Sequence, residues 1–261
     1  MDEIFGIKRD SYDMYEELLL KRDQLEREAS SIRISYMKEF GDLITEDYNL
    51  KIECIKKKKT IAYCQQSINK GQVLDMQVID ASITEDMKIY YAELEQLSHD
   101  FELAKNSKTS SASNAERAKK IYRRIAKRIH PDIYHQTMEH EELKDLWERT
   151  FSAYHMLDPD ELADIEVLIN KYLKGLGEDS FEIDIPDIDK RIEKLEAEIS
   201  EIMRTEPYIY KEILDDENAV SEKKNEFKAE IEEYKRYLEE LSGVLNDLLT
   251  EGGATFIWKM D

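Results

Sequence analysis

The sequence predicts an all-α protein, and three observations lead to that prediction. Glycine and proline are scarce, with 8 and 4 residues among 261, whereas β-sandwiches and Rossmann-type sheets need frequent turn residues. Charged residues make up 37% of the chain, and Glu, Lys, Leu and Ile dominate, as is typical of long helices and coiled coils. Apolar residues also recur at spacings of three and four, which is the spacing of one helix face.

The N-terminal region, residues 1–105, is expected to form helices and coiled coil. Its first apolar stripe has a single polar position, Arg22, within the series Tyr15, Leu18, Arg22, Leu25, Ala29, Ile32 and Tyr36. Gly41 is a candidate end or bend of this helix, and a second helical pattern follows it. A later helix is predicted to begin at a capping box, Ser82-Ile83-Thr84-Glu85, and to carry a heptad seam over residues 83–105.

A linker and a central helical region follow. Residues 106–113, NSKTSSAS, are small and polar without periodicity, so we expect a linker there. In the central region, residues 114–175, the first helix is expected to be capped by Ser113 or Asn114. It should bury Ala118, Ile121, Tyr122, Ile125, Ala126 and Ile129. Further helices are predicted from Glu141 and from Pro159, with Asp158 as the cap of the latter.

The first central helix is basic, although the formal net charge of the chain is -21. Residues 115–128 carry seven basic side chains and one acidic side chain, a net charge of +6. Pro131 cannot continue the helix, so His130 is expected at the helix end, exposed beside a rigid turn that contains Asp132. A basic face beside such a turn fits an acidic protein partner. The cations of this face are Arg117, Lys120, Arg123, Arg124, Lys127 and Arg128.

The C-terminal region, residues 176–261, contains two more heptad stretches and a short apolar tail. The stretches cover residues 185–202 and 227–248, and Pro207 with an acidic segment separates them. This break favours an antiparallel coiled-coil hairpin, while parallel pairing of two copies in a homodimer stays open. A two-stranded ribbon between FEIDI and the tail GGATFIWKM is a further alternative.

Two central segments, AERAKKIYRRIAKRIHPD and WERTFSAYHMLDPDE, are separated by a polar loop. Together they resemble the J-domain of the DnaJ family, in which a basic second helix ends in an HPD loop and a third helix packs antiparallel against it. The resemblance places His130, Pro131 and Asp132 in that loop. The family's first helix is missing before the basic helix, and the helix over residues 83–105 is a candidate to replace it. The implied packing residues are Tyr122, Ile125, Ala126, Trp147, Ala153, Tyr154 and Leu157.

The resemblance implies a co-chaperone that docks on a DnaK-type heat-shock chaperone through the basic helix and the HPD loop and stimulates its ATP hydrolysis. One alternative is a coiled-coil scaffold or dimerisation protein whose J-like unit engages no chaperone. A further alternative is nucleic-acid binding through residues 117–128. It is weaker because the acidic segments on both sides would repel the phosphate groups.

Several other classes are not expected from the sequence. No Ser-His-Asp, Cys-His or phosphate-loop arrangement indicates an enzyme, and nothing indicates a cofactor. His130, His135 and His140 are five residues apart, which is not a zinc spacing. Cys54 and Cys64 form no paired framework, which suits a reducing compartment. With no run near 18 apolar residues and no signal-like N-terminus, we expect a cytoplasmic protein without a membrane segment.

Overall fold

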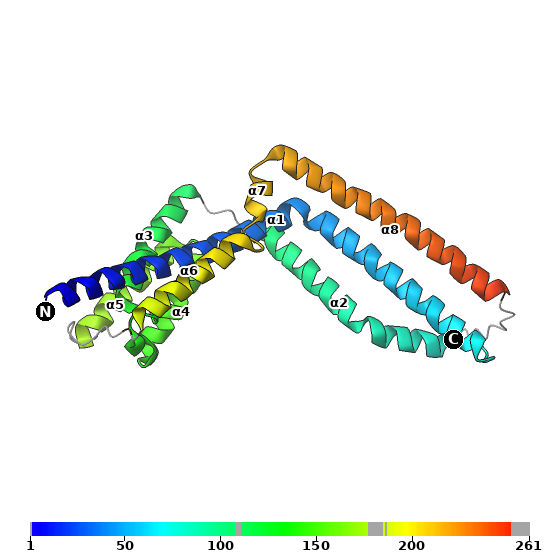
Figure 1. The fold of residues 1–261 in the computed structure, drawn as a ribbon, viewed down its shortest axis with the longest axis horizontal. Helices are drawn as coiled ribbons and strands as arrows, with labels where there is room; N and C mark the ends of the chain where they lie inside the picture. Colours follow the sequence, from blue (N-terminus) through cyan, green and yellow to red (C-terminus); the bar gives the residue numbers. More distant parts are fainter. Residues whose placement is uncertain (1, 108–110, 177–184, 186, 252–261) are drawn as a thin grey trace. The chain divides into compact units, whose positions relative to one another are not determined.

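The structure is a computed structural model that describes residues 2–107, 111–176, 185 and 187–251. Within these residues all regular elements are helical, which confirms the all-α prediction (Figure 1). None of the helices in this part of the chain is long and apolar enough to cross a membrane. The elements are α1 (Asp2–Asn69), α2 (Met76–Asn106), α3 (Ala112–Ile129), η1 (His135–Met138), α4 (Glu141–His155), α5 (Pro159–Leu176), α6 (Ile188–Arg204), α7 (Tyr210–Leu214) and α8 (Glu217–Glu251).

The chain divides into two compact units, and α1 contributes to both. The first unit combines residues 1–33 with residues 108–211, and the second combines residues 34–107 with residues 212–261. The division between residues 107 and 108 falls within the predicted linker 106–113, whereas the expected boundary near residue 175 lies inside the first unit and the expected N-terminal region is divided after residue 33. The reason is that one long helix, α1, supplies a separate packing face to each unit.

In the N-terminal region the helix does not end at Gly41, the candidate end or bend, and no helix begins at Ser82. Gly41 lies inside α1, and a Cβ atom there would lie 2.2 Å from Cδ2 of Phe101, so glycine lets this ring pack directly on the α1 backbone. α2 begins at Met76, where Asp75 accepts hydrogen bonds from the backbone N–H groups of the second and third helical residues. Ser82 lies within α2, and its hydroxyl donates to the carbonyl oxygen of Val78.

In the second unit, α2 and α8 pack on the second half of α1. The buried core of this unit consists of Ile52, Cys64, Leu74, Ile79, Ile83 and Met87. Three residues of α8 pack against this core, namely Leu245, Leu248 and Leu249. Lys57 of α1 donates a hydrogen bond of 2.9 Å to Ser242 of α8. The heptad face of α8 is thus directed to α1.

The two C-terminal heptad stretches lie in different units and do not form the predicted hairpin with one another. In the first unit, Ile192 and Leu195 of α6 form a buried cluster with Tyr15 and Leu19 of α1 and with Ile133. α8 packs in the second unit, so each heptad face is covered by a different stretch of α1. The alternative ribbon depends on residues 181–184 and 252–261, which lie outside the described residues.

The central region forms a bundle of α3, α4 and α5. In contacts with α3, Tyr122 meets Tyr154 and His130 meets Trp147, so α4 runs antiparallel to α3. Ser111 caps α3, slightly earlier than predicted, whereas Asp158 caps α5 as predicted by accepting hydrogen bonds from two backbone N–H groups. The expected packing residues belong to one core cluster, with Tyr122, Ile125, Ala126, Ala153 and Tyr154 buried and Trp147 and Leu157 partly buried.

Candidate functional site at the HPD turn

The HPD turn, residues 130–132, lies directly after α3. The backbone N–H of His130 closes the last helical turn on Ala126 at 2.9 Å. The carbonyl oxygen of His130 then accepts hydrogen bonds from the N–H groups of Ile133 and Tyr134, at 3.0 and 2.8 Å. The chain therefore reverses sharply at Pro131, as the proline predicts.

The side chain of His130 is buried, which corrects the prediction that it is exposed. His130 is only 4% exposed, and its ring centroid lies 4.7 Å from that of Trp147 in α4. The opposite end of the imidazole faces Asp23 of α1. The side chain of Asp132 is 45% exposed, so the turn presents Asp132 to solvent much more than His130.

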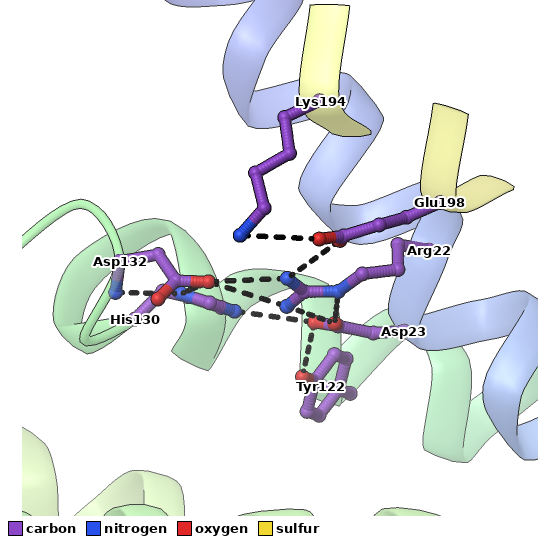
Figure 2. A network of polar contacts seen from close by, with 7 residues as sticks. All are labelled: Arg22, Asp23, Tyr122, His130, Asp132, Lys194 and Glu198. Atoms are coloured by element: carbon purple, nitrogen blue, oxygen red, sulfur yellow. Dashed lines mark hydrogen bonds and ion pairs between the residues drawn. The ribbon is translucent and has the colours of Figure 1, made fainter. Parts of the chain in front are cut away.

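Asp23 is the centre of a polar network that joins α1 to the HPD turn (Figure 2). Its Oδ2 accepts a hydrogen bond of 2.7 Å from the Tyr122 hydroxyl and lies 3.2 Å from Nε2 of His130. Nδ1 of His130 accepts the backbone N–H of Asp132 at 3.1 Å. With Nδ1 used as an acceptor, the neutral imidazole carries its proton on Nε2 and donates it to Asp23.

The network keeps Asp23 ionised although the residue is only 3% exposed. Burial alone would raise the pKa of this carboxyl group. The hydrogen bond and the electrostatic interaction with His130, the charge of Arg22 and the hydrogen bond from Tyr122 together outweigh burial, and the pKa of Asp23 lies below its usual value. Burial and the adjacent carboxylate raise the pKa of the Tyr122 hydroxyl, which therefore remains a donor.

Arg22 connects Asp23, the HPD turn and α6. Its Nη2 lies 2.9 Å from Oδ1 of Asp23, and Nη1 and Nη2 both lie 3.3 Å from Oδ2 of Asp132. Nη1 is also 3.9 Å from Glu198 of α6, which pairs with Lys194 at 3.4 Å. The sequence pattern marked Arg22 only as the polar position in an apolar stripe, and it did not mark Asp23. Their pairing with the turn depends on contacts about 110 residues apart in the chain.

The basic face of α3 is largely paired within the chain. Arg117 pairs with Asp160 at 3.0 Å, and Arg124 makes two hydrogen bonds of 2.7 Å to Glu166. Arg128 donates to Asn170. Three of the cations therefore face α5 side chains, which the sequence pattern did not anticipate.

The other cations differ in their surroundings. Lys127 pairs with Glu16 of α1 at 2.5 Å, and Lys120 pairs with Glu116 one helical turn away at 3.5 Å. Arg123 is exposed and has no ion-pair partner among the residues that the structure describes. The side chain of Lys127 is more than half exposed, whereas that of Glu16 is only 11% exposed, so this ion pair is partly buried.

α1, and not the helix over residues 83–105, packs beside the bundle of α3, α4 and α5. Residues 83–105 belong to α2 in the second unit. Leu20 of α1 is part of the core cluster of α3, α4 and α5, and the guanidinium carbon of Arg27 lies 5.8 Å from the ring centre of Tyr154. The helix over residues 83–105, the candidate replacement for the missing first helix, does not take this place, because the N-terminal stretch of α1 packs on the bundle instead.

Two open clefts lie on the first unit. A cleft of about 320 Å³ borders the HPD turn and is lined by Arg22, Glu26, His130, Pro131, Trp147 and Phe151, among others. A larger cleft, of about 900 Å³, lies between the start of α4 and the end of α5 and contains none of the predicted docking residues. The smaller cleft is the one that bears on the HPD turn, because residues of α1 and of the turn line it together.

Comparisons with protein-family models, with curated proteins and with solved structures find no match for this chain. The resemblance to J-domains therefore rests on the residues of α3, α4 and the HPD turn.

Proposed function

We propose that the chain is a J-domain-type co-chaperone that docks on a DnaK-type heat-shock chaperone and stimulates its ATP hydrolysis. The observation that supports this most is the HPD turn at the end of a basic amphipathic helix that packs antiparallel on α4. The rings of Tyr122 and Tyr154 stack at 4.0 Å and hold the two helices together at the middle of this contact. A cytoplasmic location belongs to the same proposal.

The electrostatics of α3 support an acidic partner. Arg123 is unpaired among the described residues, and the ion pairs of Arg117 and Arg124 are exposed on the arginine side. Charges of this kind raise association rates and orient a partner, and the effect weakens as salt screens them. We therefore expect docking to be of modest affinity and sensitive to salt.

The test is ATP turnover by a DnaK-type chaperone with and without the full chain. Stimulation is expected to fall in His130→Gln and in Asp132→Asn, because both variants alter the turn. His135→Gln is the matched control, since His135 is exposed in η1 five residues away and has no partner among the described residues. Circular dichroism of each variant separates loss of docking from loss of fold.

Burial of His130 favours a second candidate function, a scaffold in which the HPD turn acts only as an internal structural contact. The same assay distinguishes the two. If neither the wild type nor a variant whose α1 contacts with the turn are weakened stimulates ATP hydrolysis, the result favours the scaffold and refutes the co-chaperone. Nucleic-acid binding stays a weaker prediction, since most α3 cations already have partners within the chain.

A further inference from the structure

We propose that the N-terminal stretch of α1 is a latch that closes the HPD turn, and that a partner docks only after this stretch separates from it. The inference rests on the proposed function. It concerns the residues of α1 that face the turn, Glu16, Leu19, Arg22 and Asp23, for which the J-domain resemblance assigns no role.

The latch occupies the polar groups that the turn could offer to a partner. Nε2–H of His130 is donated to Asp23, and the carboxylate of Asp132 is paired with Arg22. A partner that needs either group must compete with α1. An internal competitor of this kind lowers the apparent affinity of a partner by the fraction of molecules in which the turn is open.

Apolar and ionic contacts extend the latch on both sides of the turn. Ile133, the residue after the turn, is 2% exposed and is covered by Tyr15 and Leu19 of α1 and by α6. On the preceding helix, Lys127 pairs with Glu16. α1 therefore contacts the chain on both sides of the turn, at the end of α3 and at the start of the loop that follows.

The contacts of the latch differ from those inside the bundle. α3, α4 and α5 bury a common apolar core, to which α1 adds only Leu20 as a buried member. The contact between α1 and the turn combines a charged network beside an open cleft of about 320 Å³ with a separate apolar cluster around Ile133. Because α3, α4 and α5 form almost all of the bundle core among themselves, α1 can separate locally while the bundle keeps its own core.

Asp23→Asn is the first test, because it removes the charge at the centre of the latch and keeps the size of the side chain. We expect faster amide hydrogen exchange at residues 130–134, measured by mass spectrometry. We also expect an approximately tenfold lower half-maximal concentration for ATPase stimulation, the effect of losing one charge-assisted hydrogen bond from the closed state. Lys21→Ala, on an exposed residue of the same helix, is the control and should change neither measurement.

A covalent lock is the second test and does not depend on weakening the core. Tyr12→Cys and Tyr134→Cys place two thiols where α1 and the segment after the HPD turn pack against the same buried cluster, and a reducible bifunctional reagent joins them. The native Cys54 and Cys64 are buried and lie in the second unit. We expect the joined protein to give no ATPase stimulation and the reduced protein to regain it.

The outcomes separate the latch from the proposed function. Equal stimulation by the joined and the reduced protein would overturn the latch and leave the co-chaperone function standing. The proposed function and the latch are both overturned if the wild type, Asp23→Asn and the reduced protein all fail to stimulate ATP hydrolysis. This outcome counts only if amide exchange at the turn is faster in Asp23→Asn, which shows that the turn has opened. Unchanged exchange in Asp23→Asn, compared with Lys21→Ala, would show that Asp23 does not hold the turn closed.

Discussion

Asp23→Ala should strongly reduce the stability of the first unit. Tyr122 and His130 are both buried, and each would lose its hydrogen-bond partner at Asp23. A buried group left without a partner costs about 1–3 kcal/mol, and Arg22 would keep Asp132 and Glu198 as partners. The free energy of unfolding should therefore fall by about 3–5 kcal/mol, a large part of the roughly 5–15 kcal/mol of a typical domain.

Urea unfolding followed by Trp147 fluorescence measures this change in the first unit. The Trp147 ring centroid lies 4.7 Å from that of His130 and 5.9 Å from that of Tyr122, so its emission reports on the region around Asp23. The chain has two tryptophans, and Trp258→Phe in all proteins leaves Trp147 as the single source of emission.

The control and a double-mutant cycle make the prediction specific. Glu17→Ala, on an exposed residue of the same helix without a partner among the described residues, should change the free energy of unfolding by less than about 0.5 kcal/mol. Tyr122→Phe should destabilise the wild type and have little further effect in Asp23→Ala, a coupling of about 1 kcal/mol or more. A loss below about 1 kcal/mol in Asp23→Ala would refute the network as a stabilising contact.

Three further predictions concern both units. Gly41→Ala should destabilise the second unit by about 1–3 kcal/mol in thermal unfolding, despite its gain in helix propensity, because the new methyl group collides with the ring of Phe101. Since the folded-state pKa of Asp23 lies below its unfolded value of about 3.9, its contribution is complete above that value and is lost as pH falls through the folded-state pKa. The stability difference between the wild type and Asp23→Asn should therefore shrink below about pH 4 in urea titrations. Burial raises the pKa of Cys54 and of Cys64, so alkylation by iodoacetamide, followed by mass spectrometry, should be slow until the second unit unfolds.

For each of these three predictions, a specific result would contradict it. Gly243→Ala is the control for Gly41→Ala, because a Cβ atom at Gly243 meets nothing within 4 Å and should add up to about 1 kcal/mol of stability. Stabilisation by Gly41→Ala to the same extent would show that Phe101 adapts freely. A stability difference independent of pH between 2 and 7 would contradict the lowered pKa of Asp23. Alkylation of native Cys64 at the rate of a free thiol would contradict its burial.

Local patterns predicted the all-α class and the buried residues of the bundle core correctly. The apolar spacing of α3 identified residues such as Ile125 and Ala126 as buried, and the Asp158-Pro159 cap placed the start of α5. Such features depend on residues within one or two helical turns, so they can be derived from a single stretch of sequence. Pro131 likewise determined by itself that α3 ends at the HPD turn.

The partners of each helix depended on the tertiary structure. A heptad stripe shows that a helix has an apolar face but not which helix covers it, so α6 and α8 could not be assigned to separate stretches of α1 in advance. His130 could not be recognised as buried for the same reason, because its partner Asp23 is 107 residues away. The sequence by itself determined the α-helices and the position of the HPD turn, since both follow from local backbone chemistry. Only the tertiary structure decided that α1 pairs with this turn, because that contact depends on charges brought together by the packing of distant segments.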